Sequence, residues 1–177
     1  MAEGPINFGK PLLYLVIIGC AGAGYYAYTH WPSHYAGPGW DIDFPHKWEC
    51  SPANDPAFPG GKWVATGPMP NEEHFNGSGW VTVNFHGAID FNAFVAERIP
   101  GGNLENKEDL DIGNKTAMIF QYEEEANKGA GDWWRFQCSA VKRGDAVVIA
   151  VAGCQKKFFA ENEEMLKKVV KSLRCER

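Results

Sequence analysis

The sequence predicts an α+β protein in which a single N-terminal transmembrane helix precedes a sandwich of a mainly antiparallel sheet with covering helices. Three observations lead to this fold class. Residues 12–28 contain no charged side chain. Several later segments alternate apolar and polar residues, which is typical of half-buried strands. Residues 159–173 carry an apolar stripe with helical spacing. Because the strands follow one another with few helices between them, an α+β arrangement is favoured over alternating parallel units.

The uncharged stretch is the centre of residues 11–35, PLLYLVIIGCAGAGYYAYTHWPSHY. A helix of about 17 residues rises about 25 Å, slightly less than the thickness of a hydrocarbon core, so we expect one membrane span. Lys10 precedes the span, and no Lys or Arg follows it before Lys47. The positive-inside rule then places residues 1–10 in the cytoplasm and residues 36–177 on the periplasmic or lumenal side of an inner or photosynthetic membrane.

Two groups of residues give the expected span its character. Small side chains along one side would allow close approach of another helix, a lipid or a flat pigment; they are Gly19, Cys20, Ala23, Gly24 and Ala27. Aromatic rings gather toward the far end, where rings with polar tips prefer the headgroup layer; they are Tyr25, Tyr26, Tyr28, Trp31 and Tyr35. The alternatives are a signal that is removed, either a secretory signal peptide or a lipoprotein signal ending at Cys20.

The charge of the chain excludes one class of partner. Its 22 Asp and Glu outnumber its 17 Lys and Arg, which gives a net charge of -5. Nucleic-acid binding needs a basic surface, so we expect no nucleic-acid partner. About 140 residues remain after the span, enough for one domain with its own core. With seven Trp in the chain, some are expected at interfaces rather than in the core.

The first part of the outer domain is expected to hold three strands joined by two loops. Trp40–Phe44 alternates apolar and polar residues. Residues 62–66 and 79–85 have the composition of strands. Residues 51–61 and 67–79 are rich in Pro and Gly, so we expect loops there. These loops, together with Trp48, are the expected contact surfaces, because irregular segments commonly carry binding.

A short helix, a polar loop and a strand follow. Asp90 is the expected N-cap of an amphipathic helix that stops at Pro100. Residues 103–114 are polar and are expected to form a loop. Residues 115–122 alternate apolar and polar side chains and are expected to form a strand.

The last third of the outer domain predicts a hairpin and a terminal helix. Residues 132–141 and 145–152 are β-prone and flank Lys142-Arg143-Gly144, the expected turn. Trp133 and Trp134 are adjacent in the first of these strands, so one should point to the core and the other to a partner or a helix. The terminal helix is expected to bury one stripe, Phe159, Leu166, Val169, Val170 and Leu173.

Four of the five cysteines lie outside the expected span: Cys50, Cys138, Cys154 and Cys175. Outside the cytoplasm four thiols can form two disulfides in three ways, and the sequence leaves the pairing open. Buried free thiols are the alternative. Cys154 and Cys175 flank the terminal helix and would lie about 25 Å apart, so they are not expected to pair with each other.

Several short segments of the outer domain resemble the PsbP family, the extrinsic proteins on the lumenal side of photosystem II and their bacterial relatives. They are Phe44-Pro45 with Trp48, the run Val147-Val148-Ile149-Ala150-Val151, and the tail from Phe159 to Val170-Lys171-Ser172-Leu173-Arg174. The resemblance implies a PsbP-like sandwich for residues 36–177 that has no catalytic activity and docks on an energy-transducing membrane complex. The resemblance favours a photosynthetic host, such as a bacterial reaction centre with its antenna, and a respiratory complex is the alternative.

No segment has the pattern of an active site. The sequence contains no G-x-S-x-G and no local Cys/His arrangement that would activate a thiol. His30 and His34 have helical spacing for a metal or pigment site, but Pro32 interrupts the helix that would bring them together. We therefore expect no catalytic, metal-binding or dedicated cofactor-binding residues, and no enzymatic activity. Lipid or pigment would contact the chain only through the expected membrane helix.

The predicted function is that of a non-catalytic accessory subunit that docks on and stabilises a multi-subunit energy-transducing membrane complex. Its partners would be integral membrane subunits, with no small-molecule substrate. The alternative is an independent membrane-anchored periplasmic binding protein or assembly factor for a small ligand or cofactor. A concave pocket with convergent polar groups would favour the alternative, whereas flat aromatic surfaces would favour the accessory subunit.

Overall fold

The structure, a computed structural model, describes residues 32–69, 72–85, 90–99, 104–112, 115–126 and 129–175. Ser33–Arg177 forms one compact unit, to which the following description applies.

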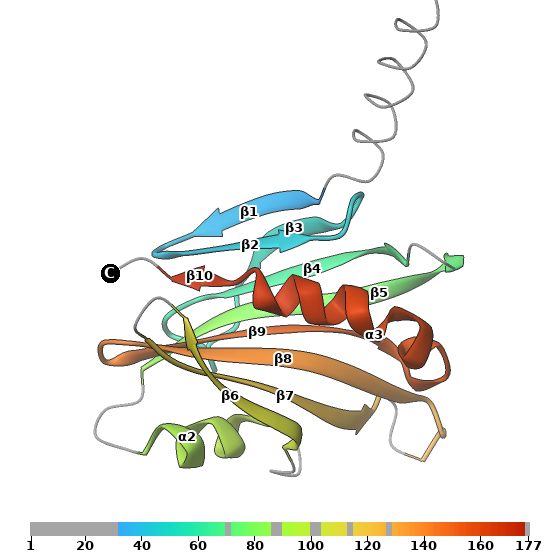
Figure 1. The fold of residues 1–177 in the computed structure, drawn as a ribbon. Coiled ribbons are helices and arrows are strands. Elements are labelled where there is room, and N and C mark those ends of the chain that lie inside the picture. Colours follow the sequence, from blue (N-terminus) through green and yellow to red (C-terminus); the bar gives the residue numbers. More distant parts are fainter. Residues whose placement is uncertain are drawn as a thin grey trace, which may run out of the picture. The chain divides into compact units, whose positions relative to one another are not determined.

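Ten strands form two antiparallel sheets (Figure 1). The larger sheet has seven strands in the order β3 (Glu49–Ala53), β4 (Lys62–Met69), β5 (Glu72–Phe85), β9 (Ala146–Gln155), β8 (Trp133–Arg143), β7 (Lys115–Glu125) and β6 (Glu105–Ile112). The smaller sheet has three strands in the order β1 (Ser33–Gly37), β2 (Trp40–Phe44) and β10 (Arg174–Cys175). The two described helices are α2 (Phe91–Arg98) and α3 (Lys156–Lys171).

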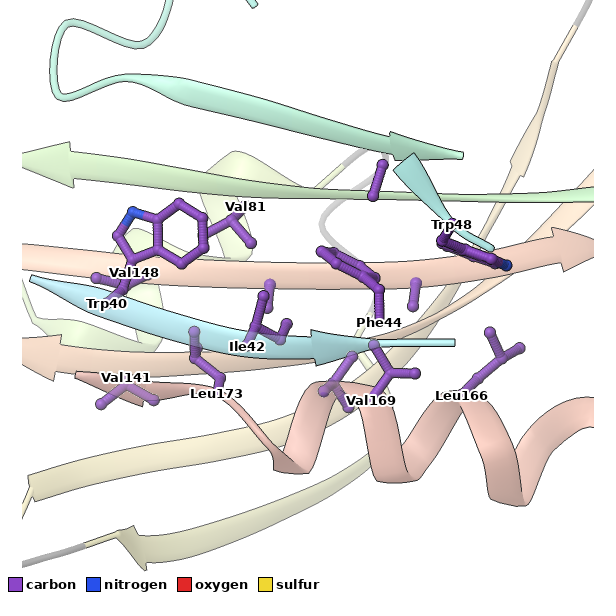
Figure 2. Close-up of a cluster of buried hydrophobic side chains, with 14 of the residues drawn as sticks. Trp40, Ile42, Phe44, Trp48, Val81, Val141, Val148, Leu166, Val169 and Leu173 are labelled. Atoms are coloured by element: carbon purple, nitrogen blue, oxygen red, sulfur yellow. The ribbon is translucent and has the colours of Figure 1, made fainter. Parts of the chain in front are cut away.

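The two faces of the seven-stranded sheet carry separate cores. One face, here called the α3 face, packs against α3 and the small sheet. Figure 2 shows its centre, where Trp40, Ile42 and Phe44 of β2 meet Leu166 and Val169 of α3. The other face, here called the α2 face, packs Phe91, Phe94, Val95 and Ile99 from α2 and its C-cap against the sheet residues Met118, Phe120, Cys138, Val147 and Ile149.

The elements with the strongest local signals are confirmed. Asp90 caps α2, since its carboxylate accepts hydrogen bonds from the backbone N–H groups of Asn92 and Ala93. The predicted hairpin is β8 and β9, and the predicted stripe of the terminal helix is buried in α3 and in Leu173, which follows the C-cap Ser172. Each of these depends on contacts between residues close in sequence or on one unbroken apolar period.

Three predicted loops contain strands instead. Residues 51–53 belong to β3, residues 67–79 belong mostly to β4 and β5, and residues 105–112 form β6. The glycines that suggested a loop serve packing: a Cβ at Gly67 would lie 2.6 Å from the Trp48 ring, and one at Gly77 would lie 2.3 Å from it. Trp48 therefore packs directly on strand backbone, and only glycine leaves the necessary space.

β6 was expected as a loop because it is polar, and its position in the sheet explains the error. It is the last strand of the sheet and pairs with β7 alone, with a register shift between Glu105 and Glu108. Edge strands commonly carry charges and bulges, which discourage pairing with another chain. A polar composition is thus compatible with a strand at this position.

The transmembrane helix in the predicted fold class, and the single-pass membrane localisation that depends on it, are corrected. In the described part of the chain, no helix combines the length and the apolar character needed to cross a bilayer. The end of the predicted span, residues 33–35, lies in β1, where Tyr35 donates a hydrogen bond to the Trp48 carbonyl at 2.5 Å and packs on Phe44. This pairing with β2 replaces the helix expected there.

The rest of the predicted span, residues 11–31, lies outside the described residues. This applies to the predicted helix-packing residues Gly19, Cys20, Ala23, Gly24 and Ala27, and to Tyr25, Tyr26, Tyr28 and Trp31 of the predicted collar.

Candidate functional site

One end of the seven-stranded sheet gathers aromatic residues from several strands and from α3. β5 and β8 begin at this end, β7 and β9 stop there, and α3 begins next to it, on the right in Figure 1. Antiparallel pairing brings these termini together although they are far apart in sequence. We call this region the aromatic end; its aromatic residues are Phe75, Trp80, Tyr122, Trp133, Trp134, Phe136 and Phe158.

On the α2 face, the aromatic end is built around Phe136. Its ring stacks on Tyr122 at a centroid distance of 4.9 Å and on Trp134 at 6.0 Å, and it meets the edge of Trp80 at 5.2 Å. Ser78, Gly153, Phe136 and Tyr122 stand opposite one another on β5, β9, β8 and β7. Residues directly opposite in antiparallel strands share a face, so these rings form one layer.

Gly153 makes this layer possible. A Cβ at Gly153 would lie 2.4 Å from the Phe136 ring and 2.4 Å from the Arg135 carbonyl oxygen. Real side chains do not approach this closely, so any other residue would push the Phe136 ring off β9. A glycine inside a strand commonly marks such a close approach.

A small pocket opens beside the ring layer. It has a volume of about 150 Å³ and is lined by Ser78, Glu124, Ala126, Trp134 and Phe136. α2 lies toward the opposite end of the sheet (Figure 1), so it does not cover this part of the face. The pocket walls are mostly apolar, and Glu124 is the charged residue among the described residues that line it.

The three consecutive glutamates at the end of β7 have different environments. Glu123 points to the α3 face, where it pairs with Arg135 at 2.9 Å and Lys156 at 2.7 Å. Glu125 accepts hydrogen bonds from the N–H groups of Gly129 and Gly131, and these lower its pKa. Glu124 lies between them and lines the pocket, and among the described residues its carboxylate has neither an ion pair nor a hydrogen bond.

Glu124 still acts on its surroundings. Burial raises the pKa of Tyr122, and the charges of Cys138 and Glu124 raise it further. Tyr122 is therefore a neutral member of the ring layer, near the exposed side chain of Glu124.

The α3 face at the same end holds a polar network instead of a pocket. The Arg135 guanidinium donates to Glu123, to Glu105 at 3.0 Å and to Gln121 at 2.8 Å, and it lies over the Phe159 ring at 5.3 Å. The buried Gln121 amide donates onward to Gln137 and Glu163. These side chains therefore hydrogen-bond to one another rather than to a ligand. Because Glu163 and Phe159 belong to α3, the network stabilises the junction of α3 with the sheet.

The four predicted disulfide cysteines are free thiols in this structure. Cys138 packs in the α2-face core, whereas Cys154 packs in the α3-face core, so the sheet separates these two. Burial raises the pKa of Cys50, Cys154 and Cys175 to about 11, and it raises that of Cys138 well above its ordinary value. Thiols with raised pKa values are poor nucleophiles at neutral pH.

No group of His, Cys, Asp and Glu residues in the described ranges could hold a metal ion. His34, proposed above as half of a helical pair, lies on β1 with Nδ1 2.8 Å from the Asp43 carboxylate. His30 lies outside the described residues.

Of the adjacent pair Trp133 and Trp134, the structure places Trp134 at the pocket, whereas Trp133 points to the opposite face of the sheet. Trp133 is 45% exposed, while Trp134 is partly buried against Phe136. Sequence reasoning missed Ser78, Glu124 and Gly153. Trp134 and Phe136 are two residues apart on β8, and this spacing indicated that one face of the strand is aromatic. It did not indicate which residues of β5 and β9 would lie beside them.

Comparison with known proteins gives a fold likeness. No family model matches the chain, and no curated protein matches it. Among solved structures, it is similar to the cyanobacterial PsbP (CyanoP) from Synechocystis sp. PCC 6803, with a TM-score of 0.59 and 14% identity over 81% of this chain and 91% of that one. A protein from Bacteroides thetaiotaomicron VPI-5482 has a TM-score of 0.50 and 12% identity over 82% of this chain and 49% of that one.

LpqN of Mycobacterium tuberculosis, described as involved in cell envelope biogenesis, has a TM-score of 0.49 and 20% identity over 82% of this chain and 90% of that one. Identities this low show the fold alone. The residues from Ser33 onward therefore have a PsbP-like fold.

Proposed function

We propose that this chain is a non-catalytic accessory protein that docks on a partner protein through its aromatic end. The observation that carries the proposal is the adjacent pair at the start of β8: Trp134 lines a pocket that α2 leaves uncovered, and Trp133, on the opposite face of the strand, is 45% exposed. Tryptophan is enriched at protein interfaces and among the residues that dominate their energetics. An exposed Trp133 next to a partly exposed Trp134 fits this role better than a role in the core.

The absence of catalysis is part of the same proposal. The charged groups of the α3 face bond one another, and the four described thiols are buried or partly buried, with raised pKa values. Neither group is arranged as a nucleophile with an activating base. These features support a binding role.

For the host, we propose a multi-subunit energy-transducing complex, photosynthetic in type, on its periplasmic or lumenal side. The support is the resemblance to the PsbP family in the sequence, together with the PsbP-like fold. Integral subunits of that complex would contact the aromatic end directly.

The second candidate is a carrier of a small ligand or cofactor, and the size of the pocket weighs against it. Small-molecule sites usually have volumes of about 300–1,000 Å³ and enclose most of the ligand. This pocket has about 150 Å³ and lies at an open edge. It is better suited to the end of one side chain from a partner.

The test is affinity recovery of the full chain from its own cells after mild solubilisation. We compare the wild type, the double variant Trp133→Ser/Trp134→Ser, and Phe85→Ser, which removes an aromatic ring that is 61% exposed at the other end of β5. The wild type and Phe85→Ser should recover a large complex in stoichiometric amount, and the double variant should recover at least tenfold less. Thermal unfolding of each variant checks that it is folded.

Two results would contradict the proposal. The first is recovery of the wild type as a lone species of 19.6 kDa. The second is equal recovery of the complex by the wild type and a folded double variant.

A further inference from the structure

A row of three residues with complementary chemistry crosses the α2 face at the pocket, and two of them, Trp134 and Glu124, line it. Gln155, Trp134 and Glu124 stand opposite one another on β9, β8 and β7, so they share the α2 face. The row places an aromatic plane between an amide and a carboxylate. Phe136 and Ser78 from the neighbouring row complete the walls.

Two hydrogen-bond acceptors of this row lack donors. The Glu124 carboxylate has no ion pair or hydrogen bond with any described residue, and the buried Oε1 of Gln155 has no hydrogen-bond partner in the same part of the chain. A buried acceptor without a donor is costly, which makes this position receptive to an N–H group. A ligand that supplies N–H donors and positive charge would pair with Glu124 in the pocket, and an N–H group that reached Gln155 beside Trp134 would satisfy the second acceptor.

The aromatic walls restrict the ligand further. The faces of Trp and Phe rings attract cations, and Trp attracts them most strongly. Quaternary ammonium groups would use the rings but have no N–H donors for Glu124 and Gln155. A guanidinium group has five N–H donors in a plane that stacks on aromatic rings, and it pairs well with carboxylates.

We propose that the pocket binds the guanidinium group of an arginine side chain presented by the docking partner, an inference that rests on the function proposed above. Trp134 provides the stacking plane, Glu124 the charge, and Gln155 a neutral acceptor beside it. The chain carries a net charge of -5, which favours a cationic partner surface in general.

The test is an NMR titration of the full chain with N-acetyl-arginine methylamide, followed at the Trp134 indole N–H and the Gly153 amide. The matched probe is N-acetyl-citrulline methylamide, which has nearly the same shape without the charge. Arginine should give saturable shifts at both signals, and citrulline should not. Replacing Glu124→Gln should weaken arginine binding by about fivefold, the size expected for one exposed ion pair.

The control variant is Glu161→Gln, which removes the same charge from an exposed position on α3. It should leave arginine binding unchanged. Equal shifts with arginine and citrulline, or equal weakening by Glu124→Gln and Glu161→Gln, would overturn the guanidinium site. Tetramethylammonium binding as tightly as arginine would overturn it too, because the N–H donors would then contribute nothing.

The outcome is separable from that of the docking proposal. If Trp133→Ser/Trp134→Ser abolishes recovery of the complex while arginine and citrulline behave alike, docking stands and the guanidinium site falls. If arginine binds selectively while the double variant still recovers the complex, the site stands as a cation site and docking through the aromatic end falls.

Discussion

The two faces of the seven-stranded sheet are covered to different extents. On one face, α3 with 16 residues and the small sheet pack over a large core. On the other face, α2 has only 8 residues and lies toward one end of the sheet. The uncovered end holds a pocket and the partly exposed rings of Trp80 and Trp134, whereas the covered face holds a bonded polar network at the same end. Incomplete covering by the shorter helix is therefore what creates a candidate binding site.

The glutamates of β7 show how the coverage of a face determines the environment of a side chain. Successive residues of a strand point to opposite faces. Glu123 is consequently placed under α3 and is paired, whereas Glu124 is placed in the pocket and has no partner among the described residues. Three consecutive glutamates thus have different environments, because the two faces of the sheet are covered to different extents.

The largest expected effect comes from comparing two substitutions, one in the covered core and one at the aromatic end, by the stability that each removes. Phe44 is 0% exposed on the α3 face, so Phe44→Ala should lower the free energy of unfolding by about 3–5 kcal/mol through lost burial and a cavity. Trp133→Ser, at a site 45% exposed, should change it by at most about 0.5 kcal/mol. Urea unfolding measures both, and similar losses would contradict the assignment of Trp133 to a binding surface.

The second test removes the centre of the polar network. Arg135→Ala deletes hydrogen bonds to Glu123, Glu105 and Gln121 from a side chain that is 23% exposed, and should cost about 1–3 kcal/mol. The matched control is Arg174→Ala, whose side chain is 64% exposed beside Asp41 and Asp43. That change should cost at most about 1 kcal/mol. If both losses are equal in urea unfolding, the network does not stabilise the junction with α3.

The sequence predicted features that depend on neighbouring residues and missed features that depend on the assembled sheet. The α3 stripe and the cap of α2 follow from residues a few positions apart, and both were predicted. β6 and the first half of β5 look like loops locally, because one is polar and the other is rich in glycine. Their strand character depends on an edge position and on packing of Trp48, which are properties of the assembled sheet.

The candidate site was less predictable still. Its layer depends on Ser78, Gly153 and Phe136 standing opposite one another, and these come from three strands whose register is fixed only by the complete sheet. The sequence indicated that one of Trp133 and Trp134 would be available to a partner. It could not show that Glu124 and Gln155 would flank Trp134.

A third test compares neighbouring glutamates. Glu123→Gln removes two ion pairs on the covered face, from a side chain 18% exposed, and should lower the free energy of unfolding by about 1 kcal/mol. Glu124→Gln removes no described pair and should change it by less than about 0.5 kcal/mol. Urea unfolding at neutral pH and low salt measures the difference. A larger loss for Glu124→Gln would mean that its carboxylate is a structural group.

A fourth test concerns the thiol on the covered face. Burial raises the pKa of Cys154 from its ordinary value of 9.0 to about 11, so the folded chain keeps this proton when the unfolded chain loses it. The unfolded state then binds fewer protons, and stability falls as pH rises from about 9 to 11. Cys154→Ala should make the fall in the urea midpoint over this range shallower, although its absolute stability at pH 8 should be slightly lower. An unchanged slope would show that Cys154 reaches solvent in the folded state, and the covered face would then be more open at its edge than the packing of α3 implies.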